Sequence, residues 1–291
     1  MIIDYVVPMV FPTDPRWRRE YMRSNHCLME DMTVVGNVRY RTWGTEQLLV
    51  RCIRRFMPWV RDVIILLSGP SQVRDWMQAE QVRIVYHSQF MPADKLPTFN
   101  SRAIEMYLHR IPGLADYFLY GNDDMFPLAP LAEEDFFQGG RPCLQATEKE
   151  LNPASNFQKA CMNGLNFVGR AFGRQFTDRW LHMGHCASPL LRSTCEMFWE
   201  KWPQEMQESV SAFRMVKNYN QYIYSWWQIL SKEYIASAPP RQYVSTKNTI
   251  REVCDAIQTA QGIVCINDNE EVCDITQYAA AVRREIEKKL T

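Results

Sequence analysis

Four short apolar runs occur in the first part of the chain, and each is rich in Val, Ile, Leu and Tyr. They cover residues 2–10, 63–68, 82–87 and 117–120. The runs are almost continuously apolar instead of alternating between apolar and polar positions. This pattern is typical of strands that are buried on both faces. It predicts a sheet with helices packed on both sides.

Segments with helical periodicity separate these runs. One begins after Thr45, which we expect to cap the helix, and it ends before Pro58. Another begins at Asn100 or Ser101. The repeated order of strand and helix predicts an α/β fold with a mostly parallel, Rossmann-type, doubly wound sheet over residues 1–130.

The remaining residues, 131–291, have a different pattern. Trp, Phe, Met and Tyr recur at helical spacing over residues 164–233, residues 263–266 resemble a late strand, and residues 275–290 resemble a charged helix. No repeat, low-complexity tract or long linker divides the chain. We therefore predict a single domain, 1–291, with an α/β part over 1–130 and a mainly helical part over 131–291.

Composition and charge exclude some classes of protein. Apolar residues make up 46% and charged residues 23% of the chain, which is ordinary for a globular protein. Lys plus Arg and Asp plus Glu both number 33, so the chain lacks the net positive charge of a typical nucleic-acid binder. The nine cysteines form no C-x-x-C pair and indicate reduced thiols. The apolar start lacks a basic region and is interrupted by Asp4, and no apolar run reaches about 18 residues. We expect a cytoplasmic protein and leave a peripheral association with the membrane open.

Two adjacent acids, Asp123 and Asp124, follow the fourth apolar run and Asn122. Open α/β sheets bind ligands at the carboxyl ends of their strands. Adjacent carboxylates can hold Mg²⁺ or Mn²⁺ against phosphates. The alternative is a turn in which an Asp merely caps backbone N–H groups. Spacing alone does not decide between these two interpretations.

Further candidates carry charge or a titratable ring. Arg39 and Arg41, beside Trp43 in an expected loop, are suited to neutralising a diphosphate. His185 is a candidate general base because its ordinary pKa is near 6.5, although a lone His is more often structural. The segment around it, H-M-G-H-C, has no second pair of ligands at zinc-site spacing. Arg214 lies in an aromatic segment, where it can stack on rings or pair with a buried anion.

Four blocks of this sequence resemble the Stealth family of sugar-phosphate transferases. The first is IDYVVPMVFPTDPRW. The second runs from Arg39 to Phe126 and includes LPTFNS, LHRIPGL and NDDMF. The third comprises HCASPLLRSTCEMFWEKW and FRMVKNYNQY, and the fourth is VCINDNEE. The blocks occur in order and cover most of the chain.

The resemblance implies a glycosyltransferase-A-like α/β fold, a nucleoside-diphosphate sugar donor, in particular a UDP-sugar, and a divalent metal, Mg²⁺ or Mn²⁺. In such a protein, residues 1–130 would bind the nucleotide sugar, and residues 131–291 would supply acceptor and catalytic groups. By this resemblance we expect His185, Arg214 and Asp124 to be catalytic, and Asp123 and Asp124 to hold the metal. We expect the donor to be bound by Asp4, Phe11, Asp14, Arg39, Arg41, Asn100, Asn122 and Asn220. We expect the acceptor to be bound by His109 and Asn218.

Two positions depart from the family pattern. Met9, Val10, Phe11 and Pro12 stand where an Asp or Asn followed by Gly is usual, and Asn218 stands where many members have an Asp. Phe11 could stack on a base or simply pack. The loss of a carboxylate at each place bears on which bond the protein breaks.

The sequence therefore leaves three functions open. The first is transfer of hexose-1-phosphate to a saccharide or lipid-linked oligosaccharide acceptor in capsule synthesis, with release of a nucleoside monophosphate. The second is ordinary glycosyl transfer with release of the diphosphate, and the third is a non-catalytic sugar-nucleotide-binding subunit. A basic stretch, RREIEKK, is the only sign of membrane contact, and a solvated helix face also explains it. The sequence does not indicate an oligomeric state.

Overall fold

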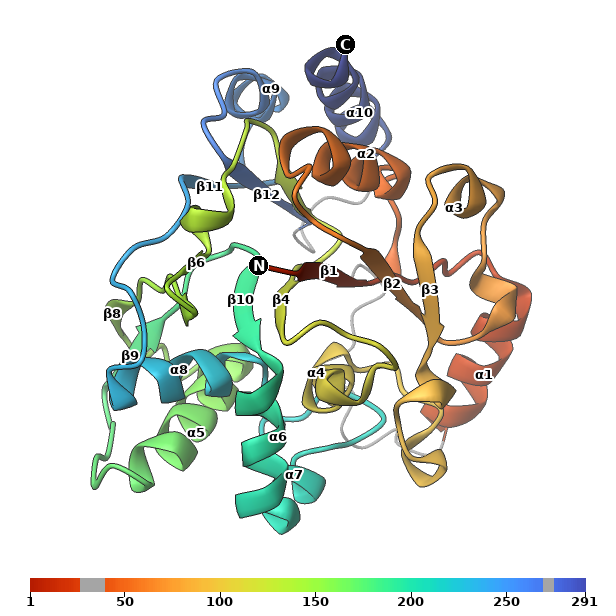
Figure 1. Cartoon of the computed structure of the whole chain (residues 1–291). Helices are drawn as coiled ribbons and strands as arrows, with labels where there is room; N and C mark the ends of the chain where they lie inside the picture. The colour runs from red at the N-terminus through yellow and green to blue at the C-terminus, as the bar shows by residue number, and fades with distance from the viewer. Residues whose placement is uncertain (27–39, 269–274) are drawn as a thin grey trace.

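The computed structural model describes residues 1–26, 40–268 and 275–291. Its main sheet has five strands in the order β10-β4-β1-β2-β3. Their bounds are β1 Ile3–Pro8, β2 Val63–Leu67, β3 Arg83–Tyr86, β4 Tyr117–Tyr120 and β10 Ser188–Leu191. Strands β1 to β4 are parallel, and β10 joins the β4 edge antiparallel (Figure 1).

Apolar side chains on both faces of the sheet explain the continuous apolar runs. In β1, Tyr5 and Val7 belong to one buried cluster and Val6 to the other. The first cluster lies under α2 (Glu46–Phe56), α9 (Ile250–Gln258) and α10 (Thr276–Leu290). The second lies against α4 (Ser101–Met106), α5 (Asn156–Arg170), α6 (Arg192–Lys201) and α8 (Tyr222–Ser231). Figure 1 shows the two helical layers on opposite sides of the sheet. The doubly wound architecture is confirmed.

A second sheet continues directly from the first. It has three strands in the order β11-β12-β5, where β5 is Met125–Pro127, β11 is Arg241–Ser245 and β12 is Ile263–Asn267. The chain leaves β4, passes Asp123 and Asp124, and enters β5. The Ile266 N–H donates to the Asp124 carbonyl at 2.8 Å, so the end of β12 is joined to the acid pair.

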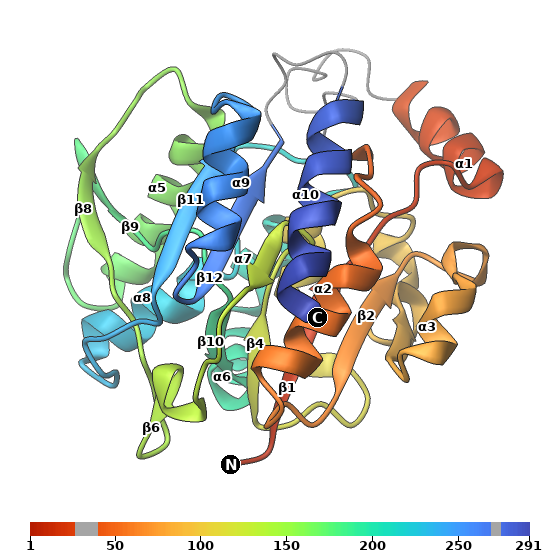
Figure 2. The same cartoon turned by 90° about the horizontal axis from the view of Figure 1, so that it is seen from above.

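Shorter elements complete the described chain. The helices are α1 Pro15–His26, α3 Asp75–Ala79 and α7 Pro203–Glu208, and the 3₁₀ turns are Pro70–Gln72, His87–Gln89, Ala93–Lys95, Leu108–Arg110 and Glu133–Asp135. Two hairpins pair β6 (Phe137–Gln138) with β7 (Arg141–Pro142), and β8 (Thr147–Glu150) with β9 (Arg179–His182). Figure 2 shows β8, β9, β11 and α5 on the side of the molecule away from α1 and α3.

The predicted α/β class and mostly parallel sheet are confirmed, as are the four early strands. The second half contains the expected helices, but it also contains strands that the sequence did not predict. Strand β10 is only four residues long and includes Pro189, which is a poor strand signal but is tolerated at a sheet edge. All cysteines among the described residues are free, as expected. None of the helices in the described ranges is long and apolar enough to cross a membrane.

Asp4 lies at the amino end of β1, away from the carboxyl ends of the strands. Its buried carboxylate accepts two bonds from the Arg61 guanidinium, at 2.9 and 2.6 Å, and one from the Ala115 N–H at 2.8 Å. These bonds tie the start of β1 to the segments that precede β2 and β4. The structure gives Asp4 a role in the fold, and its contact with a donor stays a prediction.

Replacing Asp4 by Ala should therefore destabilise the protein. The change leaves the Ala115 N–H buried without a partner and breaks a pair whose carboxylate side chain is 0% exposed. We expect a loss of about 2–4 kcal/mol in the free energy of unfolding, measured by urea denaturation. Asp116→Ala is the matched control, because Asp116 also pairs with an arginine, Arg192, but its side chain is 72% exposed. The control should lose less than about 1 kcal/mol. Equal losses in the two variants would contradict this assignment.

Candidate active site

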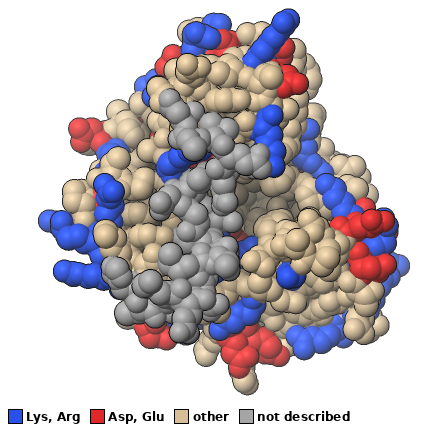
Figure 3. Space-filling model, turned by 180° about the vertical axis from the view of Figure 1, so that it is seen from behind, with Lys and Arg blue, Asp and Glu red and all other residues tan. Residues whose placement is uncertain are grey.

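A pocket of about 600 Å³ opens where the parallel strands end. Pro8 lines it at the end of β1, Met9 and Val10 after β1, Ser68 after β2, and Asn122 to Asp124 after β4. The chain winds outward from β1 through β2 to β3 and then returns to β4 on the other side of β1. The pocket thus lies at the switch point of an open α/β sheet, which is the usual ligand site in such folds. Figure 3 shows the hollow on this face of the molecule.

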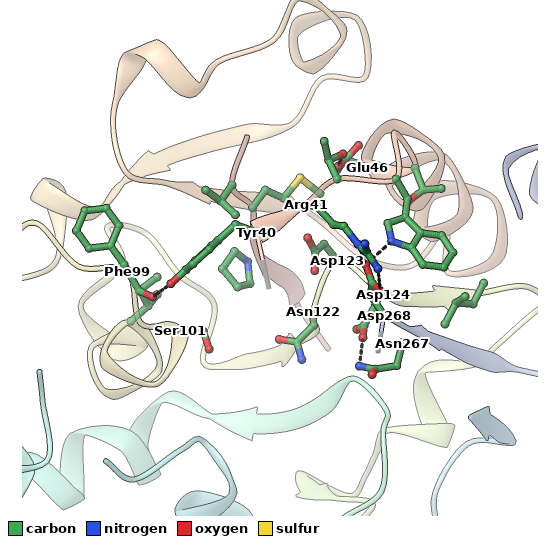
Figure 4. Close-up of a pocket in the computed structure, with 18 of the residues that line it drawn as sticks. Tyr40, Arg41, Glu46, Phe99, Ser101, Asn122, Asp123, Asp124, Asn267 and Asp268 are labelled. Carbon is green, nitrogen blue, oxygen red and sulfur yellow. Dashed lines mark hydrogen bonds and ion pairs between the residues drawn. The ribbon is translucent and has the colours of Figure 1, made fainter. Parts of the chain in front are cut away.

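The predicted acid pair lies in this pocket (Figure 4). The Asp123 side chain is open to the pocket, yet the surrounding protein still removes part of its solvent. Desolvation, followed by the charges of Asp124 and Glu46, raises the Asp123 pKa to about 7. Burial likewise raises the Asp124 pKa, opposed by the Asn267 amide and by His185. The unliganded site is therefore unfavourable for two ionised carboxylates.

These two acids are suited to a divalent cation. Asp124 Oδ2 accepts from the Asn267 amide at 3.3 Å, but the buried Asp124 Oδ1 has no hydrogen-bond partner among the described residues. A buried acceptor without a partner is costly, and a bound cation would satisfy it. The described ranges contain no group of three or more His, Cys, Asp or Glu side chains that could hold a metal. Mg²⁺ is nevertheless commonly held by one or two carboxylates together with substrate phosphates and water.

A further acid, Asp268, lines the pocket directly after β12. The Arg41 guanidinium forms a two-pronged ion pair with its carboxylate, and the Trp43 indole N–H donates to it at 3.0 Å. Figure 4 shows Arg41 reaching across the pocket toward Asp268. The predicted loop around Arg41 thus meets the fourth sequence block in space. Arg41 lines the pocket as expected, with its charge directed at Asp268.

Arg214 also lines the pocket, as predicted, and it enters from the loop before α8. Its Nη2 donates to the Ser101 hydroxyl at 2.6 Å, at the start of α4. Burial raises the pKa of the neighbouring Glu105, while Arg214 and Arg102 act to lower it. The Arg214 charge also acts to lower the Asp123 pKa. The positively charged Arg214 side chain therefore faces the acid pair across the pocket.

His185 does not line the pocket. A positive charge on His185 would lower the Asp124 pKa, and the negative charge of Asp124 acts to raise the His185 pKa. The two side chains are therefore close enough to interact electrostatically. Burial lowers the His185 pKa overall, and the imidazole is therefore neutral at pH 7. His185 is therefore placed near Asp124, outside the pocket lining.

Several predicted residues stabilise the fold around the pocket. Asn100 lines the pocket but is fully buried, caps α4 by accepting from the Arg102 N–H, and donates to Asn218 at 3.0 Å. Asn218 Oδ1 accepts from the Met215 N–H at 2.6 Å, and its amide donates to the Ser209 carbonyl at 2.6 Å. These bonds hold the loop that carries Arg214, so Asn218 acts through the fold.

Phe11 and Asp14 do not line the pocket either. The Phe11 ring is buried in the core beneath the Arg74 guanidinium, 4.3 Å from its centroid, so it packs instead of offering a face to a base. Asp14 accepts from the Arg16 N–H at 3.0 Å and from the Ser71 hydroxyl at 2.6 Å, which lowers its pKa and anchors the start of α1.

The remaining predictions fall elsewhere. His109 packs against Trp199, at 6.0 Å between ring centroids, and burial lowers its pKa to about 4. The Asn220 amide is buried and donates to the Cys161 sulfur at 3.5 Å. Neither residue lines the pocket. Asn122 does, as predicted, and Figure 4 shows it beside the acids. Arg39 lies outside the described residues.

The sequence reasoning missed several pocket residues. They are polar or aromatic side chains from loops and strand ends: Tyr40, Glu46, His87, Ser101, Lys247, Asn267 and Asp268. Asn267 and Asp268 follow an apolar run, as Asp123 and Asp124 do. The rule that found the first acid pair, applied to that second strand end, would have found them too.

Comparison with known proteins agrees with this geometry. Residues 39–143 match the family model for Stealth protein CR2, conserved region 2. The chain is 28% identical to the capsular polysaccharide phosphotransferase WcwK of Streptococcus pneumoniae, over 99% of this chain and 98% of that protein. It is 29% identical to the receptor polysaccharide phosphotransferase WefC of Streptococcus oralis, over 94% of this chain and 93% of that protein.

Two further similarities have either a lower sequence identity or a smaller covered share of the chain. A solved galactosyltransferase, LgtC, in complex with donor and acceptor sugar analogs, aligns with a TM-score of 0.40 and 10% identity, over 99% of this chain and 96% of that one. A similarity of that size does not establish a shared fold. The capsular polysaccharide phosphotransferase eps5J of Streptococcus thermophilus is 35% identical over 58% of this chain and 72% of its own length. The chain belongs to the Stealth family.

Proposed function

We propose that this protein transfers a sugar-1-phosphate from a nucleoside-diphosphate sugar, in particular a UDP-sugar, to a saccharide hydroxyl during synthesis of a surface polysaccharide. The observation that carries the proposal is the arrangement of Asp123 and Asp124 facing Arg214 in the switch-point pocket. The acids are suited to a cation and the arginine to phosphate oxygens. The named relatives act as polysaccharide phosphotransferases, which supports this class of reaction.

The pocket is suited to a nucleotide sugar in size and charge. About 600 Å³ is within the usual range for a small-molecule site. Asp123 and Asp124 would hold Mg²⁺ or Mn²⁺, which when bound would neutralise charge on the donor's diphosphate oxygens. The Arg41–Asp268 pair limits one side of the pocket and orients the loop above it.

Each step then follows from residues of this chain. Arg214, held by Ser101, offers its guanidinium to the oxygens of the β-phosphate and stabilises the charge that develops there. His185 is neutral at pH 7 and takes the proton of the acceptor hydroxyl on an imidazole nitrogen. The acceptor oxygen bonds to the β-phosphorus, and the bond from that phosphorus to the bridging oxygen breaks. The nucleoside monophosphate leaves with the bridging oxygen.

Glycosyl transfer from the same donor is the competing reaction. The sequence suggested this reaction because carboxylates that are usual in the family are missing in the Phe11 loop and at Asn218. Phe11 packs in the core and Asn218 holds the Arg214 loop, and neither lines the pocket. The departure at Asn218 therefore removes no charge from the pocket walls, whereas Met9 and Val10, which belong to the first departure, do line the pocket.

The leaving group distinguishes the two reactions. With UDP-sugars, Mg²⁺ and an acceptor glycan, we expect UMP and a ³¹P phosphodiester signal in the product. Arg214→Lys should lower kcat/KM about 100-fold, since it keeps the charge but loses the planar fork, and Arg214→Ala should lower it further. The matched control is Arg251→Lys, a side chain that is 91% exposed, which should have full activity. Release of UDP in place of UMP would refute phosphoryl transfer.

Metal binding should depend on pH through Asp123. Because its pKa in the folded protein, about 7, exceeds the ordinary value, the metal-free fold binds the proton more tightly than the unfolded chain. Stability from this group is present below about pH 4 and is lost as pH rises through 7. We expect the melting temperature of the metal-free protein to fall between pH 5 and 8 more steeply than that of Asp123→Asn. Mg²⁺ or Mn²⁺ should raise it at pH 8, and less at pH 5.

Asp116→Asn, an exposed acid far from the pocket, is the control for the pH series. It should show the same dependence on pH and metal as the parent protein. An equal metal response in the parent and in Asp123→Asn would remove Asp123 from the cation site.

A further inference from the structure

Five ring side chains in successive contact form a row near the acid pair. Neighbouring centroids are 6.2, 5.2, 6.0 and 4.6 Å apart along the row. In order, its members are Phe157, Trp180, His182, His185 and Tyr243. They come from the start of α5, from β9 and the loop after it, and from β11. Figure 2 shows α5, β9 and β11 on the same side of the molecule.

The two ends of this row are open to solvent. Phe157 is 40% exposed and Tyr243 is 47% exposed. In the part of the chain that the structure describes, they are the aromatic members of the small set of exposed large hydrophobic side chains. Trp180, by contrast, is fully buried, and its ring contacts the rings of Phe157 and His182. Exposed aromatic rings on a shared surface commonly mark a binding site.

Strand register places the Tyr243 end next to the candidate catalytic groups. Tyr243 is paired with Cys265 across β11 and β12, so their side chains share a face of the second sheet. The Cys265 sulfur donates to Asp124 Oδ2 at 3.5 Å. The His185 ring lies 4.6 Å from the Tyr243 ring, with an angle of 37° between their planes. A molecule resting on Tyr243 is therefore adjacent to His185, whose neighbour in charge is Asp124.

The loop that carries His185 has a fixed conformation. Gly184 has φ +77°, and a Cβ there would be 2.9 Å from Arg241 Nε. The Gly184 carbonyl accepts from the Tyr222 hydroxyl at 3.1 Å. Only glycine combines this backbone angle with so close an approach. The backbone that carries the imidazole is thus set before any ligand binds, with the ring against Tyr243.

Hydrogen-bonding groups border the row. The Arg241 guanidinium donates to the Gln145 side chain at 3.3 Å beside Gly184. The Lys149 charge on β8 acts to lower the pKa of both His182 and His185, so it lies near them. At the other end, the Arg102 guanidinium lies 5.7 Å from the Phe157 ring centroid. The surface therefore combines aromatic faces with polar groups of both donor and acceptor type.

We propose that the strip formed by Phe157, His182, His185 and Tyr243 binds the saccharide acceptor, with Tyr243 as the platform for the sugar whose hydroxyl reacts. This rests on the proposed function, since it takes His185 as the base. A pyranose has an apolar C–H face, which is attracted to the electron-rich face of an aromatic ring, and a rim of hydroxyls for the polar border. The donor then occupies the pocket, and the acceptor extends from the strip to the edge of the pocket beside Asp124 and His185.

Direct binding of oligosaccharides, without donor, tests the strip separately from the chemistry. The probes are chitotriose, cellotriose, maltotriose and lactose at millimolar concentration, observed by saturation-transfer NMR with the full chain. At least one should bind, and Tyr243→Ala should weaken it about tenfold, which corresponds to about 1.4 kcal/mol. Tyr243→Phe keeps the ring and should stay within about twofold of the parent. Phe157→Ala provides a second variant at the other end of the strip.

Val73→Ala is the matched control, because Val73 is also exposed, at 37%, but lies outside the strip. It should bind oligosaccharides and UDP as the parent does. UDP binding, followed by thermal shift, should be unchanged in Tyr243→Ala, which also shows that the variant is folded. The proposal is overturned if no probe binds, or if the best probe binds Tyr243→Ala and the parent equally. Intact binding combined with release of UDP in the turnover assay would instead refute only the phosphoryl-transfer function.

Discussion

The site depends on one junction, where the chain passes from the first sheet into the second at Asp124. The Asp124 carbonyl accepts from the Ile266 N–H at 2.8 Å, and its carboxylate accepts from the Asn267 amide at 3.3 Å. Because β4 ends and β5 begins on either side of this residue, the bonds fix both sheets relative to each other. They also bring Asp268 to the mouth of the pocket. A shift of β12 would therefore move the acid pair and the Arg41 contact together.

Electrostatics within the pocket follow from that placement. Arg41 compensates the charge of Asp268, and Glu46 accepts from the Thr42 hydroxyl, whereas Asp123 and Asp124 face each other's charge. The imbalance is local, since the chain as a whole carries a net charge of +0. A diphosphate accompanied by a divalent cation complements such a site better than a free anion or a free sugar does.

Much of this architecture could be predicted from the sequence, and the failures have a common cause. Strands buried on both faces leave long apolar runs, and their polar termini mark the ligand edge, so the four strands and the acid pair were found. Asp4, Asn100 and Asn218 are polar side chains with partners distant in sequence: Asp4 pairs with Arg61, and Asn100 with Asn218. Sequence spacing cannot distinguish a buried structural carboxylate or amide from one that meets a ligand. The same limit applies to His185, whose place near Asp124 depends on β9 and β10, strands that were not predicted.

The walls of the pocket come from positions as far apart as Pro8 and Val282. Domains form progressively as the ribosome extends the chain from its amino end. The parallel strands β1 to β4 are complete by Tyr120, whereas Ile266, Asp268 and Val282 are added much later. A nascent chain can thus assemble the parallel strands well before it can enclose the pocket. The complete pocket consequently exists only in nearly finished molecules.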